Sequence, residues 1–452
     1  MERYSEYKDS GVKWLGEIPS HWKVEPFGRH FSFRKGLPIT KANLIDSGEA
    51  VISYGQIHAK ENLGTTMSES LVRYVSRDYL KSHPQCLLTK DDFVFADTSE
   101  DIGGSGNFVY NDFPANIFAG YHTIVAKQSG LYNPSYYAYL FKSECWRNHI
   151  RSLVNGVKVY SIGRKQLKSN FLLFPSYKEQ DAIVRYLDAA TSKIDKAIAM
   201  QQKMIDLLNE RKQIIIQNAV TKGLDENVEM KDSGVEWIGM IPKHWKIIRL
   251  KNVFYKRIAG SWGNEQNVSP KNTVCLRIAD FEYSRLQFKK RENYTIRSYT
   301  AKEIENKKLS KGDLLIEKSG GGEKSPVGRC VVYNLEIPDV MYANFMEKLS
   351  TRGNVDSYFI CYLLSCFYSQ GMIWPYVKAT TGIQNLDIAS LLSKEYIFVP
   401  PKSEQQAIVA YLDKQMQRFD SAITNCQRQI TLLQERKQII INEVVTGKVK
   451  VS

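Results

Sequence analysis

The chain has 452 residues, of which 43% are hydrophobic, so it has the length of about three domains and is too apolar to be intrinsically disordered. Lysine and arginine number 62 against 48 acidic residues, and the net charge of +14 predicts a polyanionic partner such as double-stranded DNA. The longest apolar run, Phe359–Tyr368, is too short for a membrane span, and the N-terminal residues lack the apolar segment of a signal peptide. Because the seven cysteines form no CxxC spacing, we expect reduced thiols in a cytoplasmic protein that does not bind membranes.

The sequence contains two long internal repeats. Segments 7–22 (YKDSGVKWLGEIPSHW) and 230–245 (MKDSGVEWIGMIPKHW) are identical at 11 of 16 positions. Segments 179–221 and 404–446 share EQ-AIV-YLD near their start and ERKQIII near their end. Such a duplication predicts two similar halves. The predicted divisions are a globular domain over 1–175, a central helical region over 176–229, a second globular domain over 230–400 and a distal helical region over 401–452.

The first globular domain mixes strands with short apolar helices, which predicts an α+β fold. Tyr54 and Gln56 stand at the end of an alternating strand that begins at residue 49. Amide and hydroxyl groups in such places are suited to reading base edges. A glycine-rich loop follows from Ser99 and includes Gly103, where backbone can approach a phosphate closely. A long hairpin turn explains the same glycines equally well.

A short turn, GVKVY, precedes the central helical region and contains Lys158 and Tyr160. It is either a turn that directs polar residues toward DNA or an ordinary connection, and GIQNL from Gly382 is its counterpart before the distal region. We expect capping boxes to start the two helices, namely Ser176-x-x-Glu179 and Ser403-x-x-Gln406.

Apolar residues in both helical regions recur at a period of 3.5, which is typical of a coiled coil. The stripes comprise Leu187, Ile194, Ile198, Ile205, Leu208, Ile215 and Ala219, and Leu412, Met416, Phe419, Ile423, Cys426, Ile430, Leu433, Ile440 and Val444. Two matching helices of about 64 Å, at 1.5 Å per residue, predict an antiparallel pair that holds the globular domains apart with a pseudo-twofold relation. Simple self-association is the alternative.

Lys212 and Lys437 interrupt this stripe at equivalent positions. Two interpretations carry equal weight for them. Either these lysines face a protein partner rather than the sister helix, or they are solvated where the seam frays.

The second globular domain is rich in basic and aromatic residues, and its candidate DNA contacts are Lys256, Arg257, Trp262, Arg277 and Asp280. Lysine and arginine bind phosphates, whereas a charge run on a solvated surface is the alternative. The glycine loop of this domain contributes Lys318, Ser319, Lys324 and Ser325. Because that loop lacks the GxxxxGK[ST] order, it does not predict a nucleoside-triphosphate site.

Catalytic signatures are missing. Asn133-Pro-Ser-Tyr136 departs from the NPPY motif of amino-methyltransferases and predicts a helix start instead. Pro338-Asp339 is followed by no E-x-K at a suitable distance, which disfavours a nuclease motif. The histidines form no HExxH or HxH cluster, and His21 and His244 recur inside the IPxHW segments, where packing is the favoured role. We therefore expect a non-catalytic chain without a bound metal or cofactor.

Two variable domains that alternate with two nearly identical helical regions, together with the GVxWxGxIPxHW, EQ-AIV-YLD and ERKQIII segments, resemble the specificity subunit of type I restriction-modification systems over essentially the whole chain. The resemblance implies that each variable domain is a target recognition domain for one half of a bipartite DNA site. It also implies that the helices set the spacing and dock two methyltransferase subunits that methylate adenine, and that restriction subunits join to cleave DNA.

S-adenosylmethionine would then belong to the methyltransferase subunits, and ATP with Mg to the restriction subunits. For docking we single out the matching ERK segments, which comprise Glu210, Arg211, Lys212, Glu435, Arg436 and Lys437. A free-standing DNA-binding regulator is the main alternative, and a self-contained nuclease or methyltransferase with a degenerate motif is another.

Overall fold

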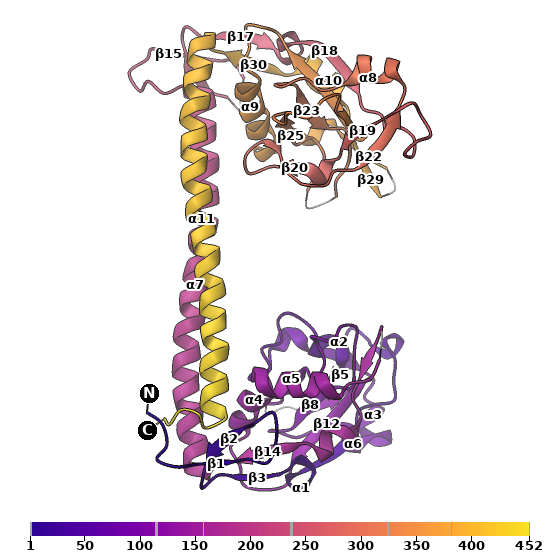
Figure 1. Ribbon diagram of the computed structural model, residues 1–452, viewed down its shortest axis with the longest axis vertical. Coiled ribbons are helices and arrows are strands. Elements are labelled where there is room, and N and C mark those ends of the chain that lie inside the picture. The colour runs from indigo at the N-terminus through magenta and orange to yellow at the C-terminus, as the bar shows by residue number, and fades with distance from the viewer. Residues whose placement is uncertain are drawn as a thin grey trace. The chain divides into compact units, whose positions relative to one another are not determined.

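The computed structural model describes residues 2–113, 116–156, 158–235, 238–322, 325–380 and 382–451. The chain divides into two compact units. Unit 1 comprises Met1–Met200 with Gln429–Ser452, and unit 2 comprises Gln201–Arg428. Each unit contains one variable domain and a part of each of two long helices, so the units cut across the four segments predicted from the sequence (Figure 1).

Unit 1 contains two four-stranded sheets, in the orders β10-β8-β12-β4 and β6-β5-β11-β7, and three two-stranded ones, β1-β2, β14-β3 and β13-β9. The strands are β1 Tyr7–Asp9, β2 Glu17–Pro19, β3 Lys23–Pro26, β4 Phe31–Lys35, β5 Glu49–Ile52, β6 Arg73–Val75, β7 Leu87–Leu88, β8 Phe93–Ala96, β9 Thr98–Ser99, β10 Phe108–Tyr110, β11 Ile117–Ala119, β12 Thr123–Gln128, β13 Tyr160–Ser161 and β14 Phe171–Phe174. The short helices are α1 Phe27–His30, α2 Tyr54–Ile57, α3 Tyr79–Ser82, α4 Pro134–Lys142, α5 Glu144–Leu153 and α6 Arg164–Ser169.

Unit 2 repeats this topology. Its six-stranded sheet β18-β27-β23-β25-β21-β20 begins with the same order as β4-β12-β8-β10, and β22-β19-β26 matches β6-β5-β11. The remaining sheets are β15-β16, β17-β30 and β24-β29-β28. The strands are β15 Met230–Asp232, β16 Met240–Pro242, β17 Lys246–Arg249, β18 Phe254–Ala259, β19 Lys271–Leu276, β20 Phe281–Glu282, β21 Gln287–Phe288, β22 Ile296–Tyr299, β23 Leu314–Glu317, β24 Ser319–Gly320, β25 Cys330–Val332, β26 Met341–Tyr342, β27 Met346–Thr351, β28 Val377–Thr380, β29 Ile383–Leu386 and β30 Tyr396–Val399. The helices are α8 Ala301–Lys307, α9 Ser357–Ser369 and α10 Ile388–Lys394.

The predicted α+β fold is confirmed by these sheets and by the helices packed against them. In unit 1, aromatic rings from strands and from α4 meet in one core, and Phe93, Phe95 and Phe141 are fully buried there. The helix start expected at Asn133 is also confirmed, because the Asn133 side chain accepts a hydrogen bond from the Ser135 amide and caps α4.

The two long helices are α7 Tyr177–Lys222 and α11 Lys402–Val445. In unit 1 the first part of α7 packs against the last part of α11, with Leu187 beside Val444 in the same core. In unit 2 the last part of α7 packs against the first part of α11. The helices therefore run antiparallel in each unit, as the heptad pattern predicts (Figure 1). Within the described residues, no helix is long and apolar enough to cross a membrane.

Each IPxHW segment is attached to the start of a long helix through a glutamate. Glu179 accepts hydrogen bonds from His21 Nε2 at 2.8 Å and from Trp22 Nε1 at 3.2 Å. In unit 2, Glu404 makes the same two contacts, with His244 at 2.8 Å and Trp245 at 3.0 Å. The repeated histidines therefore have the positional role expected for them.

Only one of the two predicted capping boxes forms. Ser176 Oγ accepts a hydrogen bond from the Glu179 amide, and the Glu179 carboxylate accepts one from the Ser176 amide. The box at Ser403 is wrong, because α11 begins at Lys402 and Ser403 lies inside the helix. The second repeat has Pro401 where the first has Ser176, so the hydroxyl group of the cap is missing there.

Candidate nucleic-acid interface

In each unit the glycine loop pairs with the short turn that precedes a long helix. Ser99 of β9 faces Tyr160 of β13 in an antiparallel ladder. In unit 2, Ser319 of β24 faces Asn385 of β29, and the Ser319 hydroxyl donates to Asn385 Oδ1 at 2.6 Å. Two candidate segments that lie about sixty residues apart in the sequence are thus neighbours in the structure.

The residues predicted after the strands β5 and β19 form the same cap in both units. Gln56 Oε1 accepts a hydrogen bond from the Ser53 amide at 3.1 Å, and Asp280 Oδ2 accepts one from the Arg277 amide at 2.8 Å. Asp280 is only 2% exposed, so its carboxylate holds the turn rather than standing on the surface. The exposed member of this pair is Arg277.

A corner beside each glycine loop was missed by the sequence analysis. It lies between β11 and β12 in unit 1 and between β26 and β27 in unit 2. The carbonyl of His122 accepts a hydrogen bond from the Asp97 amide at 3.1 Å, and the carbonyl of Phe345 accepts one from the Lys318 amide at 2.8 Å. An aromatic ring that directly follows a buried strand is the signal that could have revealed both positions.

The unit 1 corner combines rings with a carboxylate. His122 has a left-handed φ of 55°, and its ring centroid lies 5.4 Å from that of Tyr54. Its Nδ1 lies 3.3 Å from Asp97 Oδ1, and 56% of the His122 side chain is exposed. Tyr54 is therefore placed beside polar groups that are suited to hydrogen bonding with a nucleic acid.

The first glycine loop is closed by contacts within unit 1. The carbonyl of Gly103 accepts hydrogen bonds from Arg147 at 2.7 Å and from Arg151 at 3.2 Å. Burial lowers the pKa of Arg147 to about 10. Ser99 is 2% exposed and donates to the carbonyl of Asp101 at 2.6 Å, so it shapes the loop from inside. Lys158, in contrast, is exposed beside this loop.

The second glycine loop is in part a hairpin turn. The backbones of Gly322 and Ser325 form a two-way bridge, with N···O distances of 3.0 and 3.1 Å. Lys324 lies outside the described residues. The hairpin interpretation is therefore realised for Ser325, while contact with a phosphate stays a prediction.

The basic residues of β18 are separated from one another by their contacts. Arg257 pairs with Glu347 at 2.7 Å, whereas Lys256 is exposed. Trp262 follows the strand and lies under the guanidinium group of Arg297, which is 4.9 Å from the ring centroid. Cation–π contact fixes this tryptophan near the surface.

The lysines that interrupt the heptad stripes turn toward the sister helix. Lys212 Nζ donates to Asp420 Oδ1 at 2.9 Å and to the carbonyl of Ser284 at 3.0 Å. Lys437 Nζ donates to both carboxylate oxygens of Asp195, at 2.6 and 2.7 Å. The expectation that these lysines face a partner rather than the sister helix is therefore wrong, and so is a solvated seam at Lys212, which is 8% exposed.

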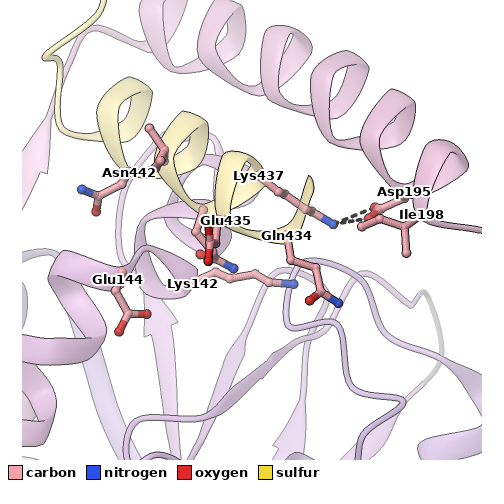
Figure 2. Close-up of a pocket in the computed structure, with 10 residues that line it drawn as sticks. Lys142, Glu144, Asp195, Ile198, Gln434, Glu435, Lys437 and Asn442 are labelled. Atoms are coloured by element: carbon pink, nitrogen blue, oxygen red, sulfur yellow. Dashed lines mark hydrogen bonds and ion pairs between the residues drawn. The ribbon is translucent and has the colours of Figure 1, made fainter. Parts of the chain in front are cut away.

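The other members of the two ERK segments are exposed on the helices and stay candidates for partner contacts, namely Glu210, Arg211, Glu435 and Arg436. In unit 1 the Lys437–Asp195 pair borders a cavity of about 800 Å³ (Figure 2). Lys142 also lines this cavity, donates to the carbonyl of Leu63, and has its pKa lowered to about 8 by burial.

No group of three or more His, Cys, Asp or Glu side chains is arranged to hold a metal ion in the part of the chain that the structure describes.

Comparison with known proteins agrees with this organisation. The family model for the type I restriction modification DNA specificity domain matches residues 19–204 and 242–434. The chain is 21% identical to the type I restriction enzyme MjaVIII specificity subunit of Methanocaldococcus jannaschii, over 98% of this chain and 97% of that protein. It is 24% identical to the putative type I restriction enzyme MjaX specificity subunit of the same organism, over 98% of both proteins.

A solved structure from work on complex assembly and conformational transition of the type I R-M system has the same fold. Its TM-score is 0.66 at 17% identity, and the match covers 96% of this chain and 99% of that chain. Two matches to the family model, one in each half, coincide with the two variable domains and the adjoining helices. The chain therefore belongs to the family of type I restriction-modification DNA specificity proteins.

Proposed function

We propose that each variable domain reads one half of a bipartite DNA site on behalf of a type I restriction-modification complex. The observation that carries this proposal is the repetition of one backbone arrangement with different side chains. Ser99 opposes Tyr160 in unit 1, whereas Ser319 opposes Asn385 in unit 2. A common scaffold with different polar groups suits two half-sites of different sequence.

The antiparallel helices α7 and α11 determine the distance between the half-sites in this proposal. Their seam is continuous with the cores of both units, because Leu187 and Leu412 are fully buried in unit 1 and unit 2 respectively. The exposed ERK residues then dock two methyltransferase subunits, which supply S-adenosylmethionine and methylate adenine. Restriction subunits with ATP and Mg complete the complex. The chain itself is non-catalytic in this scheme and acts in the cytoplasm.

Sequencing of modified bases in the host genome tests the proposal. Three strains are compared, in which this gene is intact, deleted, or altered by exchange of residues 246–399 for the variable domain of a relative. We expect a split methylated motif that disappears on deletion and changes in one half only on exchange. A motif that changes in both halves would contradict the assignment of one half-site to each domain.

Partner dependence separates this proposal from a free-standing regulator. The purified chain and its complex with the methyltransferase subunits are compared in binding to the methylated motif. We expect methylation only from the complex. Transcriptional changes without any methylated motif, together with tight specific binding by the chain alone, would favour the regulator.

A further inference from the structure

Three large apolar side chains are exposed beside the glycine loop of unit 2. Trp262 is 39% exposed, Phe345 48% and Ile383 47%. Their segments are joined by backbone hydrogen bonds, from the Ser261 amide to the Tyr342 carbonyl and along the ladder between β24 and β29. We call these three residues the aromatic patch.

Phe345 is the most firmly placed member of the patch. The strands on either side of it, β26 and β27, are buried almost throughout, yet its own ring is turned outward. Its carbonyl accepts hydrogen bonds from the Lys318 amide at 2.8 Å and from the Ser319 amide at 3.2 Å. Because two strands hold the backbone, the ring is presented from a rigid corner rather than from a mobile loop.

The patch is surrounded by positive charge. Arg297 stacks on Trp262, and Arg277 begins the short helix whose Ile278 lies next to Gly320. Among the described residues, no carboxylate forms an ion pair with Lys318 or Arg277. Exposed rings rimmed by unpaired cations are suited to a nucleic acid, which offers both phosphates and base faces.

Unit 1 has a different group at the equivalent corner. His122 occupies the place of Phe345, with its carbonyl bound by the Asp97 amide, and Asp97 stands where unit 2 has Lys318. The His122 ring is polar and lies beside a carboxylate. One corner is thus apolar and cationic, and the other is polar and acidic, although their backbones match.

We propose that Phe345 acts as a wedge that enters a base step in the half-site bound by unit 2, where its ring replaces base stacking. This inference rests on the proposed function. Apolar side chains that enter a base step unstack it, and pyrimidine–purine steps unstack most readily. Specificity at this step therefore comes partly from the ease of deforming the DNA, and His122 confers no such wedge on unit 1.

The test uses the complex of the full chain with its methyltransferase subunits. Duplexes carry 2-aminopurine at successive positions of the unit 2 half-site, so that unstacking at one step raises fluorescence. We expect such a rise with the wild-type complex. In Phe345→Ala the rise disappears, and affinity for the methylated motif falls about 5- to 100-fold, the range for loss of one stacked ring. Phe345→Trp keeps both properties.

Tyr396→Ala is the matched control. Tyr396 is 38% exposed and has Arg249 over its ring at 4.6 Å, but it lies in β30, next to the start of α11. We expect its fluorescence rise and affinity to equal those of the wild type. An unchanged signal and affinity in Phe345→Ala would overturn the wedge, and so would loss of the methyltransferase subunits from that variant. If the wild-type complex bound specific and scrambled duplexes equally, the proposed function itself would fall.

Discussion

Replacing Lys212 by methionine should weaken the helix pair of unit 2 far more than replacing Lys437 weakens that of unit 1. The two lysines are equivalent in the repeat and each pairs with an aspartate of the sister helix. Their surroundings differ. The side chains of Lys212 and Asp420 are 10% and 19% exposed. Those of Lys437 and Asp195 are 18% and 55% exposed.

The magnitudes follow from this difference in burial. Removing one partner of a buried ion pair costs roughly 3–5 kcal/mol, because a carboxylate is left unpaired. Asp420 keeps a distant contact with Arg285 at 3.7 Å and some exposure, so we expect about 2–3 kcal/mol for Lys212→Met. Asp195 remains solvated, and the value for Lys437→Met should be that of a surface pair, about 0.2–1 kcal/mol.

Hydrogen exchange measured by mass spectrometry resolves the two units separately. A local cost of about 2–3 kcal/mol accelerates exchange about 30- to 150-fold in peptides of α7 and α11 from unit 2. The double variant Lys212→Met/Asp420→Leu should recover most of the protection, since no unpaired charge remains. Equal acceleration by the two single substitutions, or no effect of Lys212→Met, would refute the argument from burial.

Three further outcomes are expected. Burial by itself raises the pKa of Glu179, but the hydrogen bonds that its carboxylate accepts from His21, Ser176 and Trp22 outweigh burial and leave the pKa below the usual 4.5. A carboxyl group with a lowered pKa stabilises the folded state above its unfolded pKa and loses this contribution as pH falls through the folded pKa. The melting temperature should therefore fall below about pH 4.5, and Glu179→Gln should reduce this dependence, whereas an unchanged acid limb would contradict it. Arg277→Ala should relax one base position in the unit 2 half-site at a cost of about 1–3 kcal/mol, as read from the methylated motif; uniform weakening on all sequences would identify a phosphate contact. Insertion of one heptad in both α7 and α11 adds about 10.5 Å of helix and should lengthen the methylated spacer by about 3 base pairs, and an unchanged spacer would exclude the helices as the spacing element.

The internal repeat and the heptad stripe determined much of the architecture from sequence alone. Both are periodic signals, and apolar periodicity is imposed directly by burial along one face of a helix. The pairing of Leu187 and Leu412 with opposite ends of the sister helix follows from two matching stripes in one chain. The prediction failed at Ser403, where the repeat lacks a hydroxyl at the capping position and Glu404 instead contacts His244 and Trp245.

Other features depended on contacts between segments that are distant in the chain. The direction of Lys212 is decided by Asp420 and by the carbonyl of Ser284, and no local pattern reports either one. The pairing of Ser99 with Tyr160 and the outward ring of Phe345 are likewise results of strand pairing. Local sequence determines which face of an element is apolar, whereas only the tertiary structure decides which polar groups meet, because each meeting is set by backbone hydrogen bonds between remote strands.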